Sequence, residues 1–238
     1  MATTATATFN LDLNAIVEEA FERCGAELRS GYDLRTARRS LNLLFAEWAN
    51  RGVNLWTVEQ GSQVLTSGTA TYNIPVDTVD LIEHVIRTGT GSNQTDIDIS
   101  RISVSTYASI PNKTVQGRPI QIYIDRKSGA TSATSVVQYP TFTVWPVPDS
   151  SQTYTLVYWR LRRMLDAGNG VNTQDIPFRF LPCLVAGLAY YMSLKIPGAE
   201  SRIPMLKGMY DEAWALAAEE DRDRSAVRFV PRQSFLTS

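Results

Sequence analysis

The sequence predicts an α+β protein: an antiparallel helical bundle made of N- and C-terminal helix pairs, an inserted antiparallel β-sandwich or barrel-like module, and an extended C-terminal arm. Three observations lead to this class. Apolar residues recur at spacings of three and four near both ends of the chain, they alternate with polar residues in the middle, and the last residues are too charged to form a core. The corresponding ranges are 1–56, 57–165, 166–221 and 222–238.

The first helix pair is predicted from capping residues and apolar stripes. Asp12 or Asn10 can cap a helix over 13–24, and Gly25 can end it in a left-handed conformation. A second helix is expected over 33–51, where Gly52 follows the last residue. Each helix has one apolar stripe and therefore needs a partner against which to bury it.

The second helix pair is expected near the C-terminus. Asp175 can cap a helix that continues to about Lys195, with Pro177 in its first turn, where a backbone N–H has no partner anyway. Apolar residues surround this helix almost completely, which predicts that it is buried. The last helix is expected from about residue 204 to residue 220, with one apolar stripe. Packing this pair on the first gives a four-helix bundle.

The middle of the chain alternates with a period of two, which predicts strands. Two short runs, 63–65 and 69–74, flank residues 66–68, and this spacing predicts a hairpin. Further strands are expected at 81–88, 97–99, 120–124, 141–145 and 154–161, with a helical turn over 103–109. Because no long helix separates these strands, the crossovers that a parallel sheet requires are missing, and we expect an antiparallel sandwich or small barrel.

Composition and charge exclude several classes of protein. A net charge of −1 and a pI near 5.9 give no basic field that would draw the whole molecule to nucleic acid or membrane. No apolar run reaches the ~18 residues of a membrane span, and the N-terminus lacks the features of a signal peptide, so we interpret it as a short disordered leader. Cys24 and Cys183 lie in helical apolar patterns, which predicts two reduced core thiols and synthesis in a cytoplasm.

Residues that could carry catalysis or bind a metal do not form a convincing set. His84, the only histidine, lies in a predicted strand, and we interpret it as a structural or surface residue. One histidine and two distant cysteines cannot form a zinc site of the usual ligand types. Asp96 and Asp98 would share one side of a strand, a pattern that exposed positions also produce. We therefore expect no catalytic residue, no metal and no cofactor.

The C-terminal arm carries the strongest candidate for a binding site. From residue 221 to residue 238, four arginines stand against two aspartates, with apolar residues between the charges. A frayed terminus would explain this pattern. The alternative is a segment that becomes ordered on a partner, arginines pairing with carboxylates and phenylalanines filling pockets; nucleic acid is a weaker candidate partner because the aspartates interrupt the basic track. The candidate residues are Arg222, Arg224, Arg228, Phe229, Val230, Pro231, Arg232 and Phe235.

The chain resembles the head-to-tail adaptor, or connector, proteins of short-tailed bacteriophages. The resemblance rests on motifs spread in order over nearly the whole chain. They are ARRSLNLLFAEWANRGVNLW at 37–56, YASIPNKT at 107–114, GRP at 117–119, YIDR at 123–126, WPVPD at 145–149, IPFRF at 176–180, GLA at 187–189 and EDRDRS at 220–225.

This resemblance implies a virion protein of the neck or tail, made in the cytoplasm of the host bacterium. It implies a ring of about twelve copies beneath the portal, which requires a heterologous interface that closes. The arm would reach up onto the portal protein, the lower face would dock the tail nozzle or tail tube, and the genomic DNA would pass through the lumen without sequence-specific binding. No membrane anchor is implied. The loops at 89–96 and 127–136 are expected to face a tail partner or solvent.

Two other functions stay open on the sequence alone. One is a tail-associated module that binds carbohydrate or a tail protein through an exposed aromatic platform of Trp145, Tyr154, Tyr158 and Trp159. Alternating placement in strands favours the core for these residues. The other is a cell-wall hydrolase, which would need an acid beside a second carboxylate in a cleft.

Overall fold

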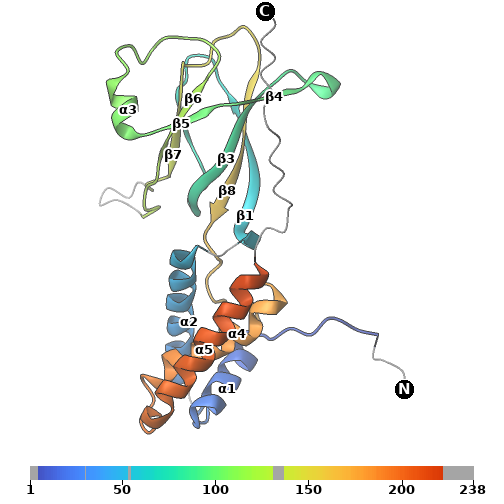
Figure 1. Ribbon diagram of the computed structural model, residues 1–238, viewed down its shortest axis with the longest axis vertical. Coiled ribbons are helices and arrows are strands. Elements are labelled where there is room, and N and C mark those ends of the chain that lie inside the picture. The colour runs from blue at the N-terminus through green and yellow to red at the C-terminus, as the bar shows by residue number, and fades with distance from the viewer. Residues whose placement is uncertain (1–4, 30, 53–54, 131–136, 222–238) are drawn as a thin grey trace, which may run out of the picture. The chain divides into compact units, whose positions relative to one another are not determined.

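The computed structural model describes residues 5–29, 31–52, 55–130 and 137–221 (Figure 1). The chain forms two compact units. The helical unit comprises Met1–Leu55 and Ala167–Ser238, and the β unit comprises Trp56–Asp166. Within the described residues there are five α-helices and two sheets, which confirms the predicted α+β class.

In the helical unit, α1 (Leu13–Cys24) and α2 (Gly31–Arg51) form where the apolar stripes predict them. The Asp12 carboxylate caps α1 by accepting a hydrogen bond from the Ala15 N–H at 2.8 Å. Gly25 ends the helix with a φ of 76°, in the left-handed region that glycine adopts without strain. These local signals explain why the start and end of α1 agree with the sequence.

The C-terminal helices are α4 (Leu181–Ser193) and α5 (Ile203–Glu220), each preceded by a short 3₁₀ turn, η3 (Phe178–Phe180) and η4 (Glu200–Arg202). The predicted helix start at Asp175 is wrong. Ile176 precedes Pro177, and a residue in that position is driven toward extended backbone, so a helix cannot run through it. Pro177 is itself extended, with a ψ of 148°, and α4 starts only after η3.

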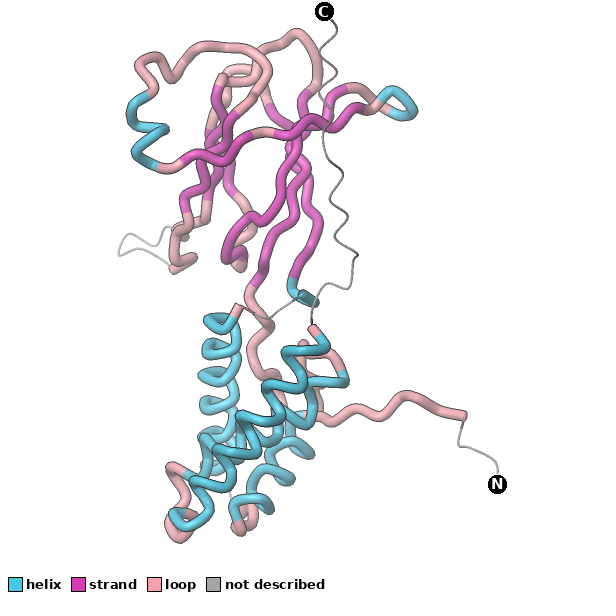
Figure 2. Tube along the Cα trace, in the orientation of Figure 1, coloured by secondary structure: helices cyan, strands magenta, loops and turns pink. Residues whose placement is uncertain are grey.

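Helix α4 is the centre of the helical unit. It packs against α1, α2 and α5, while α1 and α2 contact each other much less (Figure 2). Ten of its side-chain positions are buried, as its nearly continuous apolar sequence predicts. Gly187 lets two neighbours approach: a Cβ at this position would lie 2.9 Å from Leu44 Cδ2 and 2.9 Å from Tyr210 Cε2.

The β unit contains two four-stranded sheets that share one apolar core. The first has the order β1 (Val58–Leu65), β8 (Tyr154–Arg162), β3 (Thr78–Thr88), β4 (Thr95–Asp98), and the second has the order β2 (Thr71–Asn73), β7 (Thr141–Trp145), β6 (Gln121–Asp125), β5 (Ser100–Ile102). Three short helical turns accompany them: η1 (Leu55–Thr57), η2 (Gly91–Asn93) and α3 (Val104–Ser109). The shared core includes Leu81, Ile86, Ile122, Phe142, Tyr154 and Leu156, all 2% exposed or less.

The predicted hairpin around residues 66–68 is wrong, because the two strands that flank the turn belong to different sheets. β1 pairs with β8 and β2 pairs with β7. The turn itself is real and is held by the Tyr72 hydroxyl, which accepts from the Thr66 N–H at 2.8 Å and approaches the Thr66 and Thr69 carbonyls at 3.1 and 2.9 Å. The chain therefore crosses between the sheets at this point.

The expectation of a wholly antiparallel β module is also wrong at one edge. β5 pairs with β6 in parallel, through Ser100–Gln121, Arg101–Ile122 and Ile102–Tyr123. A parallel pair needs a crossover of roughly a dozen residues or more. The connection over 103–120, which includes α3, supplies it. Ser103 caps α3 by accepting from the Thr106 N–H, which confirms the predicted helical turn.

Candidate functional site

The eight predicted arm residues all lie outside the described part of the chain. They are Arg222, Arg224, Arg228, Phe229, Val230, Pro231, Arg232 and Phe235. Their role in binding stays a prediction. The structure does describe the residue from which the arm departs, Asp221, and the contacts that hold it.

Asp221 anchors the end of α5 in the helical unit. Its backbone N–H donates to the Ala217 carbonyl at 3.2 Å, and its side chain is fully buried. One carboxylate oxygen accepts from Arg179 Nη2 at 2.9 Å, and the other accepts from the Leu55 N–H at 3.0 Å. A buried carboxylate with both a cation and a backbone donor is well satisfied. The starting point of the arm is therefore fixed to two other segments of the helical unit.

An aromatic cluster supports this anchor. Trp48 lies 5.7 Å from Phe180, the residue after Arg179, and 5.2 Å from Trp214 on α5, measured between ring centroids. The Arg51 guanidinium lies 4.6 Å from the centroid of Trp214, a cation–π contact. Rings of this size restrict movement of η3 and of the end of α5 because they fill the space between α2 and α5.

Two tyrosines meet the Glu47 carboxylate beside this cluster. The Tyr191 hydroxyl donates to Glu47 at 2.7 Å, and the Tyr210 hydroxyl donates to the other carboxylate oxygen at 3.2 Å while accepting from Trp48 Nε1 at 2.9 Å. Burial and the hydrogen bond to Glu47 raise the pKa of Tyr191 to about 12. Burial raises the pKa of Tyr210 even further. Both hydroxyls thus act as neutral donors at physiological pH, which suits a structural role.

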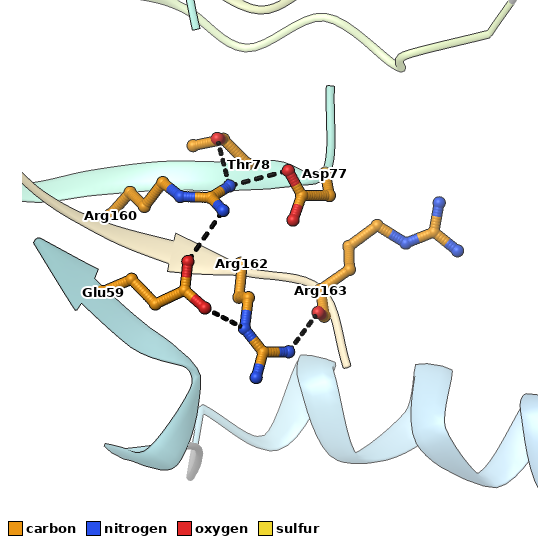
Figure 3. Close-up of polar contacts among 6 residues, drawn as sticks. All are labelled: Glu59, Asp77, Thr78, Arg160, Arg162 and Arg163. Carbon is orange, nitrogen blue, oxygen red and sulfur yellow. Dashed lines mark hydrogen bonds and ion pairs between the residues drawn. The ribbon is translucent and has the colours of Figure 1, made fainter. Parts of the chain in front are cut away.

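A charged cluster ties three strands together at one end of the first sheet of the β unit (Figure 3). The Glu59 carboxylate on β1 accepts from Arg160 Nη2 at 2.8 Å and from Arg162 Nε at 2.6 Å on β8. Arg160 Nη1 also donates to the Asp77 carboxylate at 2.7 Å and to the Thr78 hydroxyl at 3.0 Å. The Arg163 side chain points away from the cluster, and only its carbonyl takes part, accepting from Arg162 at 3.0 Å.

This cluster stands where the chain enters and leaves the β unit, since β1 begins at Val58 and β8 ends at Arg162. Burial alone would raise the pKa of Asp77, but the hydrogen bond and charge of Arg160 hold it below the ordinary value. The arrangement contains no nucleophile beside a base. Chemically it can clamp strands, and it fixes β1, β3 and β8 relative to one another.

The residues considered for catalysis and metal binding are not brought together. His84 lies on β3, as predicted, and burial lowers its pKa, which favours the neutral ring. Asp96 forms a two-bond ion pair with Arg87, at 2.7 and 2.8 Å. Over the described ranges, no group of three or more His, Cys, Asp or Glu residues could hold a metal ion. In the same ranges no helix is long and apolar enough to span a bilayer.

The cysteines and the proposed aromatic platform are both placed by the structure. Cys24 and Cys183 are free and buried, which confirms the prediction of two core thiols. Tyr154 and Tyr158 are buried, whereas Trp145 and Trp159 are partly exposed. The prediction of an exposed platform of four aromatic residues for a binding module is therefore wrong, because the two tyrosines are buried.

The sequence did not predict the ion pair of Asp221 with Arg179 or the charged cluster of Glu59 with Arg160. Asp221 was expected to contribute to the charge balance of the arm, but it is an internal ion-pair partner of Arg179. The Glu59–Arg160 cluster had one weak signal, two arginines at alternate positions in a strand that is otherwise apolar and aromatic. The partners Glu59 and Asp77 lie far away in the sequence, so the pairing itself had no local signal.

Comparison with models of protein families identifies a family that covers most of the chain. The family model described as SU10 adaptor protein matches residues 12–232. The matched range covers the described part of both units from residue 12 onward and continues into the range of the predicted arm. No curated protein matches the chain.

Proposed function

The chain belongs to the SU10 adaptor protein family, and from this premise we propose that it is a structural protein of a bacteriophage virion, the head-to-tail adaptor. In this proposal the protein forms a ring beneath the portal of a short-tailed phage and connects the capsid vertex to the tail. The observation that carries it is the family match over residues 12–232, which includes both units and most of the arm. The residue motifs at 37–56, 107–114 and 145–149, which lie within the matched range, agree with it.

The proposed architecture is a four-helix bundle built from the N- and C-terminal helix pairs, with the β unit inserted as a sandwich between α2 and α4. Two features support it. The helical unit is assembled from both ends of the chain, and α4 packs against the three other long helices. In the β unit, side chains from both sheets meet in one core. In this proposal the arm departs from the helical unit at Asp221.

The arm is proposed to bind the portal protein. Its arginines, Arg222, Arg224, Arg228 and Arg232, would pair with carboxylates, and Phe229, Val230 and Phe235 would fill apolar pockets. The anchoring of Asp221 to Arg179 and to the Leu55 N–H supports this role, because a fixed starting point reduces the volume that the arm must search.

The remaining partners follow from the same proposal. About twelve copies would close a ring through a heterologous interface. The lower face would dock the tail nozzle or tail tube, with the loops at 89–96 and 127–136 as the surfaces expected to meet a tail partner or solvent. Genomic DNA would pass through the lumen, and a net charge of −1 is compatible with a passage that does not grip phosphates. The protein would be made in the host cytoplasm and reside in the virion neck.

The test is to mix the purified protein with the portal ring of the same phage and to image the product by electron microscopy. We expect a second ring of repeated copies beneath the portal. A chain that ends at Asp221 keeps the anchor but lacks the arm, and it should fail to attach while its circular dichroism and melting temperature stay nearly unchanged. Loss of the fold on this deletion would show that the arm belongs to the core and would contradict the proposed role.

Two further variants separate charge from shape in the arm. Replacing the four arginines by lysine keeps the charge but removes the planar fork, so weaker portal binding would indicate paired carboxylates. Replacing Phe229 and Phe235 by alanine tests the apolar anchors alone. If intact protein stays free in the presence of an intact portal ring, the adaptor proposal loses its main support, and binding and hydrolysis assays on cell-wall fragments become the next measurement.

A further inference from the structure

Helix α1 carries an acidic, partly apolar surface that the rest of the described chain does not cover. Ala15, Glu18 and Glu22 lie within about 60° of one another around the helix at 100° per residue. They line a groove of about 880 Å³ together with the N-terminal residues Ala7, Phe9 and Leu11 and with the paired Glu19 and Arg23. The other wall of the groove comes from η3 and α4. The groove residues of that wall are Phe178, Leu181, Pro182 and Val185. Phe178 is 77% exposed and Pro182 is exposed too, whereas Leu181 and Val185 are buried, so part of the apolar wall faces solvent in the separate chain.

The charges on α1 are unbalanced. Glu19 is paired with Arg23 at 2.9 Å, but Glu18 and Glu22 are exposed and have no partner among the described residues. Like charges four residues apart on a helix repel each other. The pair therefore weakens the isolated helix, and a cation from outside the unit would relieve the repulsion.

Helix α2 carries the opposite pattern on its outer face. Arg35, Arg39, Leu43 and Ala46 are all exposed and lie within about 80° around the helix. No described residue pairs with either of these two arginines, which again stand four residues apart. Leu43 is 54% exposed. The positive character extends to Lys195, whose pKa is lowered by burial and by the charge of Arg39.

The two surfaces match in spacing and order. On the first, the apolar residues Leu11 and Ala15 precede the acidic pair, and on the second the basic pair precedes Leu43 and Ala46. An antiparallel alignment therefore places Arg39 beside Glu18 and Arg35 beside Glu22. In the same register Leu43 falls beside Ala15 and Ala46 beside Leu11. Charge and apolar contacts are satisfied together only in this direction.

The arrangement of the helical unit permits such a contact between copies. α4 lies between α1 and α2 and packs against both, so the two surfaces belong to different sides of the unit (Figure 1). The two helices run in opposite directions within one chain (Figure 1). A rotation about an axis along the helices preserves these directions, so α2 of one copy meets α1 of the next in antiparallel orientation. A contact between two different surfaces of the same chain can close a ring.

We propose that the outer face of α2 in one copy packs antiparallel into the α1 groove of the neighbouring copy, with Arg39 pairing with Glu18 and Arg35 with Glu22. This inference rests on the proposed function, because it assigns residues to the interface that the ring requires. The apolar residues supply most of the buried area, and the charge pairs set the register and reject wrong neighbours.

Disulfide trapping tests the register directly. A chain carrying Ala15→Cys and Leu43→Cys, assembled on the portal and oxidised, should give a ladder of covalent multimers on a denaturing gel. A ladder is expected because each chain provides both halves of a heterologous contact, whereas an isologous contact would stop at dimers. The matched control, Ala15→Cys with Leu216→Cys, uses an exposed residue of α5 and should give no ladder. Native Cys24 and Cys183 are buried and should not interfere.

Charge reversal tests the proposed pairs. Glu22→Arg alone and Arg35→Glu alone should each reduce the fraction of chains in rings about tenfold, because each places like charges together. An equimolar mixture of the two variants should restore assembly, since alternating copies form opposite-charge pairs at every contact. Restoration cannot arise from a general loss of stability in either variant.

The outcomes separate this inference from the adaptor proposal. If wild-type rings form on the portal but the cysteine pair gives no ladder and both reversals assemble normally, the interface is wrong and the adaptor function stands. If wild-type protein forms no ring on the portal, the proposed function itself fails. A disulfide from position 15 to a cysteine introduced at Phe229, with none to position 43, would assign the groove to the arm and overturn the inference.

Discussion

The carboxylate of Asp221 accepts a hydrogen bond from Arg179 Nη2 at 2.9 Å at the residue where α5 ends. The carboxylate is fully buried, whereas the arginine side chain is 37% exposed. Solvent therefore reaches the ion pair only from the arginine side. Loss of the carboxylate would also leave the part-buried N–H of Leu55 without its acceptor. This contact fixes Asp221, the residue that precedes the predicted arm, within the helical unit.

We expect Asp221→Ala to destabilise the helical unit by about 1–3 kcal/mol, because it removes a buried charged acceptor that two donors share, Arg179 and the Leu55 N–H. Asp221→Asn keeps an acceptor for the Leu55 N–H and should cost less. Urea unfolding monitored by tryptophan fluorescence measures both, because Trp48 and Trp214 lie in the adjacent cluster. Equal stability of the alanine variant and the wild type would show that the buried carboxylate contributes nothing to the fold.

Gly187 provides a second test of packing in the helical unit. A Cβ at this position would approach Leu44 and Tyr210 to 2.9 Å, closer than real Cβ contacts allow, so Gly187→Ala should cost about 1–3 kcal/mol despite the better helix propensity of alanine. The matched control is Gly208→Ala on α5, where nothing lies within 4 Å and a gain of about 0.5–1 kcal/mol is expected. Thermal unfolding of the two variants should shift in opposite directions. A gain in both would mean that α4 is not packed as closely as described.

The sequence predicts the four long helices well because each has a local cause. Capping by Asp12, termination at Gly25 and the apolar stripes of α2 and α5 depend on residues a few positions apart. The start of α4 was misplaced for a reason that is local too: the backbone restriction that Pro177 imposes on Ile176 outweighs the capping tendency of Asp175.

Strand pairing could not be predicted in the same way. The crossing of the chain between sheets after β1 depends on the Tyr72 hydroxyl and on distant partners in β7 and β8. The parallel edge between β5 and β6 is likewise set by a long connection. Pairing of this kind has no signature within a short window of sequence.

For the candidate site, composition predicts the arm. The ion pair of the preceding residue, Asp221, could not be predicted, because its partner Arg179 lies far away in the sequence. The arm residues from Arg222 to Phe235 stay a prediction, since they lie outside the described residues. The acidic and basic pairs on α1 and α2 were visible in the sequence as exposed charges. Only the arrangement of the helices around α4 shows that they belong to different sides of one unit.

We expect the β unit to lose folding stability in acid, because the Asp77 carboxylate becomes protonated. Arg160 lowers the pKa of this carboxyl in the folded state, so the pair contributes stability at pH values above about 3.9, the ordinary value for an unfolded chain. The contribution is lost as the pH falls through the lower folded pKa. Melting temperatures measured from pH 2 to pH 6 should therefore fall less steeply toward acid for Asp77→Asn than for the wild type.

The control for this titration is Thr78→Val, which removes the hydroxyl that accepts from Arg160 at 3.0 Å without changing any charge. This variant should melt lower at every pH and keep the wild-type slope toward acid. A slope for Asp77→Asn equal to that of the wild type would show that the Arg160–Asp77 pair does not contribute to acid sensitivity.

The two cysteines should react with thiol reagents only when the helical unit opens. Burial raises the pKa of Cys24 to about 11 and that of Cys183 to about 12, so at pH 8 neither forms much thiolate, the reactive species. In a disulfide-exchange assay with a coloured aromatic disulfide, native protein should release almost no product, and two equivalents should appear in guanidinium. Ser201→Cys, at an exposed position, should add one equivalent that reacts at once in the native state. Rapid reaction of the wild type without denaturant would show that α1 or α4 opens readily. The rate of the thiol reaction would then measure the frequency of opening.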